Sequence, residues 1–263
     1  MAVIETELFG DVIEAESISQ ILTFIGEKDC HIYMWRGQGD ISWPIDSAAY
    51  RRLLKSNRSA NYPDEDMLRD YERDLLLDAR HQGYGFENGR TITDFELLAK
   101  LQHHGAATRF IDVSRNMLVA LWFACRSEPD VTGLLFGVNE GAILGLEGNS
   151  ENSAYNDAFP PGEKIEKDIF PTIWQPPVVT KRIAAQSAQF LYSVVSHDRM
   201  GSLALSKESG AFIAFGITPR KKRQFLKMLE KTFDIRLLTL FPDFDGFSMA
   251  NSANFSRYNN ARY

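Results

Sequence analysis

The chain has few cysteines, no long apolar run and no excess of positive charge. Its two cysteines, Cys30 and Cys125, lie in apolar contexts without metal-ligand spacing, so we expect buried thiols in a reducing compartment and no metal site. No apolar run approaches the roughly 20 residues that a membrane helix needs. The formal net charge of −6 disfavours non-specific nucleic-acid binding through a global field.

The start of the chain is acidic and lacks the basic-then-apolar layout of a signal peptide. We therefore expect a cytoplasmic protein without a membrane partner. With 44% hydrophobic residues over a length of 263, the chain can bury a sizeable core.

Helix and strand patterns follow one another along the chain. Helix caps and 3.6-residue periodicity predict helices over residues 17–26, 64–81, 93–104, from 115 onward and from 219 onward. Apolar and alternating runs predict strands over residues 30–35, 132–139, 184–195 and 210–218. Residues 147–164 are polar and rich in turn formers, which predicts a loop. This order indicates an α+β fold, in which N-terminal helices pack on a mixed or antiparallel core sheet.

A cation ends the first predicted strand, in the stretch YMWRGQGD. Arg36 is followed by Gly37 and Gly39, and two interpretations are open. The arginine is either a strand-end residue paired with a carboxylate, or an anion-binding group. In the second case the glycines let a ligand approach the backbone and the guanidinium forks onto a phosphate.

Polar residues are concentrated between two predicted helices, at residues 102–116. A helix start beside Arg109 favours an anion site. Ser114 or Asn116 stands where the cap of the second helix belongs, which leaves Asp112 free to orient His103 or Arg109. The alternative for the histidine pair is a helix end that favours imidazoles through its dipole.

Two further segments carry polar or basic residues. If residues 180–190 form a strand, Arg182, Ala184 and Gln186 share one face, with room for a ligand beside Gln186; the alternative is a solvent-facing edge. The run PRKKRQ at residues 219–224 places four cations at a helix start, either as a solvated face or as a contact to nucleic acid.

Together these segments resemble the FRG domain family. Four ordered motifs carry the resemblance: WRGQ from Trp35, QHHGAATRFIDVS with the helix after it, RIAAQSAQF, and LFPDFDGF at residues 240–247. The sequence departs from the family pattern at His104, Val113, Ser114 and Ala188. The resemblance implies a single FRG-like domain over residues 1–263, with a core from about 17 to 247 and a tail at 248–263.

The motif layout also looks like the ADP-ribosyltransferase fold and implies NAD as the substrate, with no metal. The resemblance implies that Arg36 binds phosphate or ribose, that His103 with Asp112 forms a polar pair at the reaction centre, and that Gln186 aligns the ribose or the target. The other binding residues that it implies are Gly37, Gln38, Gln102, Thr108, Arg109, Ser114 and Arg182.

The implied function is ADP-ribose transfer to a protein or nucleic-acid acceptor, or NAD hydrolysis, in a toxin or phage-defence effector. Gln186 carries no charge where such enzymes use a carboxylate. Either Gln186 positions a substrate, or Asp112 or Glu208 supplies the charge, or the protein binds a nucleotide without turnover. The alternative is a non-catalytic module that binds a nucleotide or nucleic acid. A hydrolase using His103 and Asp112 is less favoured because no nucleophile stands out.

Overall fold

The computed structural model describes residues 2–27, 31–56, 62–144, 154–159, 171–176, 181–198, 200–205 and 210–253. Cys30, Glu208, most of the predicted loop at 147–164 and the tail beyond residue 253 lie outside the described residues. Over the described ranges, no helix has the length and apolarity needed to cross a bilayer.

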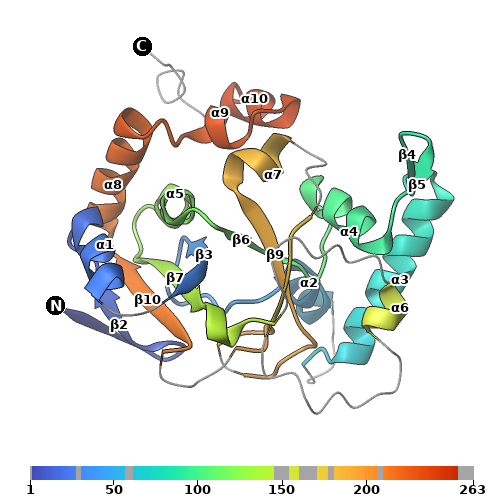
Figure 1. Cartoon of the computed structure of the whole chain (residues 1–263), viewed down its shortest axis with the longest axis horizontal. Coiled ribbons are helices and arrows are strands. Elements are labelled where there is room, and N and C mark those ends of the chain that lie inside the picture. Colours follow the sequence, from blue (N-terminus) through green and yellow to red (C-terminus); the bar gives the residue numbers. More distant parts are fainter. Residues whose placement is uncertain are drawn as a thin grey trace.

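A mixed sheet of eight strands forms the centre of the molecule (Figure 1), in the order β1-β2-β10-β7-β3-β6-β9-β8. β10 and β2 pair in parallel and the other neighbours are antiparallel. The bounds are β1 Val3–Thr6, β2 Gly10–Glu14, β3 Ile32–Gln38, β6 Ile111–Ser114, β7 Gly133–Asn139, β8 Thr172–Trp174, β9 Ala188–Tyr192 and β10 Phe212–Ile217. A hairpin of β4 (Phe86–Glu87) and β5 (Arg90–Thr91) lies apart. The predicted α+β class is confirmed.

The helices surround this sheet. Figure 1 shows α5 against the middle of the sheet, α1 and α8 toward one end, and α3 and α4 toward the other. The bounds are α1 Ile18–Glu27, α2 Ala48–Ser56, α3 Glu65–His81, α4 Asp94–His103, α5 Met117–Arg126, the 3-10 turn η1 Glu140–Ala142, α6 Tyr155–Ala158, α7 Lys181–Gln186, α8 Pro219–Thr232, α9 Leu237–Leu240 and α10 Phe244–Ala250.

Side-chain caps begin the long helices where the sequence predicts them. The Asp64 carboxylate accepts from the Met67 amide at 2.9 Å, and Thr93 with Glu96 forms a capping box at the start of α4. Asn116, one of the two predicted candidates, caps α5 by accepting from the Leu118 amide at 3.0 Å. The predictions for these three helix starts are confirmed.

The strand predicted over residues 184–195 is wrong in its first part. Residues 181–186 form the short helix α7, and Ser187, with a φ of +46°, turns the chain into β9. The alternation expected for Arg182 and Gln186 therefore does not exist. Because the two residues are four apart on a helix, they still lie on one face.

β3 and α5 approach each other very closely. Trp35 belongs to the apolar cluster that includes α5, and Gly37 faces the same helix. A Cβ added at Gly37 would overlap the Ala120 carbonyl and lie 2.6 Å from the Ala124 amide nitrogen. The absent side chain of Gly37 thus admits the α5 backbone.

We expect Gly37→Ala to lower the free energy of unfolding by about 3 kcal/mol, because the added methyl group meets rigid backbone. Urea unfolding measures the change. Gly26→Ala is the matched control: a Cβ at Gly26 meets nothing within 4 Å, and alanine suits a helix. A Gly37→Ala protein as stable as the Gly26→Ala protein would contradict the packing described.

Candidate functional site

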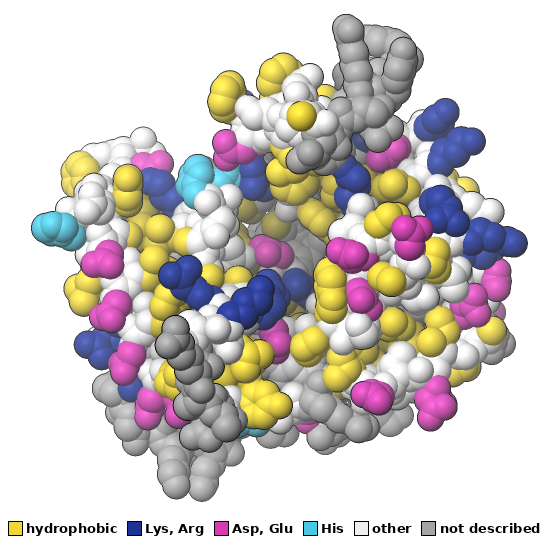
Figure 2. Space-filling view, turned by 180° about the vertical axis from the view of Figure 1, so that it is seen from behind, with side chains coloured by type: hydrophobic (Ala, Val, Ile, Leu, Met, Phe, Trp, Pro, Cys, Tyr) yellow, Lys and Arg dark blue, Asp and Glu magenta, His cyan; other side chains and the backbone are white. Residues whose placement is uncertain are grey.

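A cavity of about 310 Å³ opens between β3, β6, α4, α5 and α7. Its volume lies at the lower end of the range of small-molecule sites, roughly 300–1,000 Å³. Figure 2 shows a hollow in this face of the molecule, with histidine side chains on its rim and lysine and arginine side chains beside it. Eight of the residues predicted for the site line the cavity: Arg36, Gly37, Gln102, His103, Asp112, Ser114, Arg182 and Gln186.

A second cavity of about 580 Å³ adjoins the first and shares Arg36, Gly37 and Phe123 with it. Trp43 lines this larger cavity, together with two cations of α2, Arg51 and Lys55. The Arg51 guanidinium is held by the Asp46 carbonyl, to which it donates at 2.7 Å. None of these three residues belongs to the predicted site, although the i,i+4 spacing of Arg51 and Lys55 on a helix places both cations on one face.

Arg36 lies on the boundary between the two cavities. Its Nη1 donates to the backbone carbonyl of Asp112 at 2.8 Å, and its Nε donates to Gln38 Oε1 at 3.1 Å. Gln38 in turn donates to the Trp43 carbonyl at 3.0 Å, and it lines only the larger cavity of the two. Burial lowers the pKa of Arg36, while the Asp112 charge raises it. The guanidinium is therefore fixed in place by neutral acceptors.

Asp112 presents an exposed carboxylate within the smaller cavity. Gln102 Nε2 donates to its Oδ1 at 2.8 Å, and the buried Thr108 hydroxyl donates to Gln102 Oε1, which orients that amide. The surrounding protein raises the pKa of Asp112 through desolvation, and the Arg36 charge acts in the opposite direction. The hydrogen-bond partner of Asp112 is thus Gln102, and neither His103 nor Arg109 as the sequence interpretation offered.

Ser114 and Gln186 are joined by hydrogen bonds at the cavity wall. The Ser114 hydroxyl donates to the Gln186 carbonyl at 2.7 Å and accepts from the Asn116 amide at 3.0 Å. Gln186 Nε2 donates to the Leu240 carbonyl at 2.9 Å. The side-chain amide of Gln186 is therefore bonded to the last residue of α9, and Gln186 shapes the cavity wall.

Arg182 is paired with Asp243, the N-cap of α10, through two hydrogen bonds of 3.0 Å, and its guanidinium lies 4.7 Å from the Phe241 ring centre. His103 Nε2 lies 3.6 Å from Asp243 Oδ2. Burial, with Arg182 and His104 beside it, lowers the pKa of His103. The carboxylate next to His103 is thus Asp243, whereas Gln102 is the α4 residue that contacts Asp112.

Arg109 lies outside both cavities, which corrects its predicted role in binding a ligand. Its Nε donates to Glu72 at 2.6 Å, its Nη1 to Glu65 at 2.9 Å and its Nη2 to the Tyr155 hydroxyl at 2.6 Å. Burial alone would lower the pKa of Arg109, but Glu72, Tyr155 and Glu65 raise it. Thr108 is likewise buried and acts on the site only through Gln102.

Two cations of the basic run at residues 219–224 form bonds within the protein. Lys222 is buried and donates to the carbonyls of Gly39, Ser127 and Glu128 at 2.5, 3.0 and 2.8 Å. Lys221 lies 2.6 Å from Glu16. A contact to nucleic acid through this run loses most of its support, since two of its four cations are committed to these bonds.

Residues 31–132 match the FRG domain family. This confirms the predicted resemblance over a range that holds the first two of its four motifs and includes Arg36, Gln102 and Asp112. No curated protein matches the chain, and no solved structure matches it. The ADP-ribosyltransferase-like layout stays a prediction.

Glu72→Gln should lower the free energy of unfolding by about 3–5 kcal/mol, because it leaves the buried guanidinium of Arg109 without its main counter-charge. Urea unfolding at neutral pH measures the loss. Asp70→Asn, which removes the exposed pair with Arg73, is the control and should change stability by less than about 1 kcal/mol. Equal effects of the two variants would contradict the importance of the buried pair.

Asp112→Asn should raise stability at neutral pH. With a raised pKa, folded Asp112 holds its proton more tightly than unfolded Asp112. Its stabilising contribution is therefore complete below the unfolded pKa of about 3.9 and is lost as pH rises through the folded pKa. Urea unfolding between pH 4 and pH 8 should show the advantage of the variant shrinking on acidification. A variant less stable than the wild type at pH 7 would contradict the raised pKa of Asp112.

Proposed function

We propose that the two adjoining cavities bind NAD, and that the protein is an ADP-ribosyltransferase-like enzyme that breaks the bond between nicotinamide and ribose. One observation carries the proposal: the cavities share Arg36, the smaller one contains the Asp112 carboxylate, and the larger one contains the cations Arg51 and Lys55. Each cavity also has a charged residue of the opposite sign, but Arg182 in the smaller cavity pairs with Asp243, and Asp46 in the larger cavity is buried and accepts from the Ser202 amide. The exposed charges are therefore divided along a continuous site.

NAD has the complementary division of charge. Its nicotinamide ring is cationic and its pyrophosphate is anionic. Asp112 in the smaller cavity suits the ring and the ribose, while Arg36, Arg51 and Lys55 suit the pyrophosphate, because guanidinium and ammonium groups bind phosphate oxygens strongly. Trp43, which is 43% exposed, offers an aromatic face to the adenine.

The reaction needs a negative charge where positive charge develops. As the C1′–N bond breaks, its electron pair goes to the nicotinamide nitrogen and positive charge develops on the ribose. The Asp112 carboxylate stabilises that charge, and Gln102, itself oriented by Thr108, fixes the carboxylate. Water or an acceptor group then bonds to C1′ and releases a proton. Asp112 can take this proton, since a raised pKa suits a general base. Gln186 positions the wall through Leu240.

The rival function is a non-catalytic module that binds a nucleotide in the same cavities. The exposed Arg52, beside Arg51 and Lys55 on α2, extends the basic surface beyond the cavity and favours an anionic macromolecule as acceptor or ligand. A role as a toxin or phage-defence effector follows from the resemblance alone and stays a prediction, as does a cytoplasmic location.

Nicotinamide release from NAD, with and without cell extract, tests the proposal. We expect release by the wild type, a kcat lower by about 100-fold or more in Asp112→Asn, and a raised KM in Arg51→Ala and Lys55→Ala because these cations bind the ground state as well. Asp70→Asn and Arg73→Ala, which lie on the surface of α3, are the charge-matched controls and should leave both constants unchanged.

Two outcomes would count against the enzyme. NAD binding that needs Arg51 and Lys55 but gives no release would establish the non-catalytic module. Release that is unchanged in Asp112→Asn would place the reaction elsewhere in the protein.

A further inference from the structure

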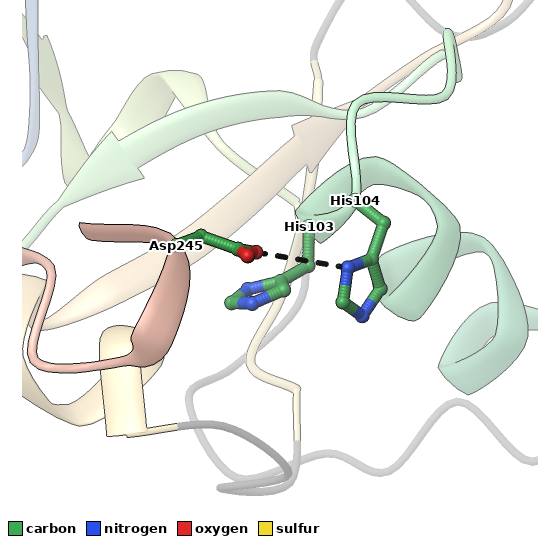
Figure 3. Close-up of side chains that lie close together, drawn as sticks. All are labelled: His103, His104 and Asp245. Atoms are coloured by element: carbon green, nitrogen blue, oxygen red, sulfur yellow. Dashed lines mark ion pairs between the residues drawn. The ribbon is translucent and has the colours of Figure 1, made fainter. Parts of the chain in front are cut away.

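Two consecutive histidines at the end of α4 lie beside a carboxylate at the start of α10 (Figure 3). One ligand atom each of His103, His104 and Asp245 lie within 4.8 Å of one another. The His104 Nδ1 and the Asp245 carboxylate are 3.9 Å apart, and the two imidazole rings are 4.9 Å apart at an angle of 79°. Three donor atoms from two distant segments of the chain therefore converge on one point.

We propose that these three residues bind a divalent transition-metal ion of the zinc type. Two imidazoles and one carboxylate are a donor set of zinc and of non-haem iron sites, whereas Mg²⁺ and Ca²⁺ prefer oxygen ligands alone. Metal bonds of about 2.0–2.2 Å would draw the three atoms somewhat closer together. Water would complete the coordination, because His104 and Asp245 have side chains that are 63% and 58% exposed.

The two helix ends are positioned independently of any ion. α10 begins at Asp243, whose carboxylate accepts from the Gly246 amide at 2.8 Å and pairs with Arg182. Asp243 is thereby committed, while Asp245 on the same turn is directed at the histidines (Figure 3). The alternative is a simple ion pair between the two helix ends. An ion pair of exposed groups 3.9 Å apart contributes little to stability.

The site lies at the edge of the smaller cavity, because His103 lines that cavity. A bound ion would join α4 to α10 beside the opening. Metal binding here does not depend on which ligand the cavity binds. The metal-site proposal and the NAD proposal can therefore be disproved independently of each other.

Calorimetric titration of the metal-free full chain with Zn²⁺ tests the site, and visible absorption of a Co²⁺ complex reports the coordination. We expect a single ion per chain and no comparable binding of Mg²⁺. His104→Ala and Asp245→Asn should each weaken Zn²⁺ binding by at least about 10-fold, since even outer-shell partners of metal ligands contribute 10–100-fold. Both side chains are exposed, so both variants should unfold in urea like the wild type when metal is absent.

His81→Ala is the matched control, because His81 is an exposed histidine at the end of α3. The residue before it, Arg80, pairs with Asp94 at the start of α4, so His81 lies toward the end of α4 that is opposite to the proposed metal site. It should bind Zn²⁺ as the wild type does. Absence of Zn²⁺ binding, or binding equally strong in His104→Ala and Asp245→Asn, would overturn the proposal and leave an ion pair between helix ends. Equal weakening by His81→Ala would also overturn it, because the effect would not be local.

Discussion

The geometry of both cavities depends on the close contact between β3 and α5. Gly37 has no side chain, so the α5 backbone lies directly against the strand. The same strand pairs with β6 through Trp35 and Ser114. The contact therefore fixes Arg36, at the strand end, relative to Asp112 on β6 and to Phe123 on α5. A bulkier residue at position 37 would separate the walls of both cavities at once.

Two buried polar networks support this arrangement from opposite sides. Lys222 donates to three carbonyls at the ends of β3 and α5, which holds the connection beyond Arg36. Arg109 joins α3 to α6 and to the chain that enters β6. Each cation replaces its lost hydration with several acceptors, as burial of a charge requires. Burial thus separates the cations that sequence patterns predict as ligand-binding into structural ones and ligand-accessible ones.

Local signals in the sequence predict α1, α3, α4, α5 and α8, because caps and periodicity act over a few residues, but they miss the short helices α6, α7, α9 and α10. The bounds of α3 follow from its cap, Asp64, and from the apolar residues of its inner face. Glu72 comes four residues after the buried Leu68, so it could have been identified as a charge on that inner face. The sequence predicts a strand over residues 184–195, whose first residues belong to α7 in the structure, because a short segment with apolar residues fits both periods. Arg51 and Lys55 could not be assigned to the site from sequence, since only the tertiary structure brings α2 to it. Asp243 and Asp245 lie in the motif LFPDFDGF, but only the tertiary structure brings α10 beside α4.

The surroundings of Asp112 differ from those of a carboxylate in an ion pair. A direct bond between the guanidinium of Arg36 and the carboxylate of Asp112 would give each group a charged partner. Instead Arg36 donates to the backbone carbonyl of Asp112, and the carboxylate accepts from the neutral amide of Gln102. The protein thereby keeps within a cavity an accessible acid whose raised pKa opposes folding at neutral pH. Such a cost is typical of groups that are retained for chemistry or for binding a cation.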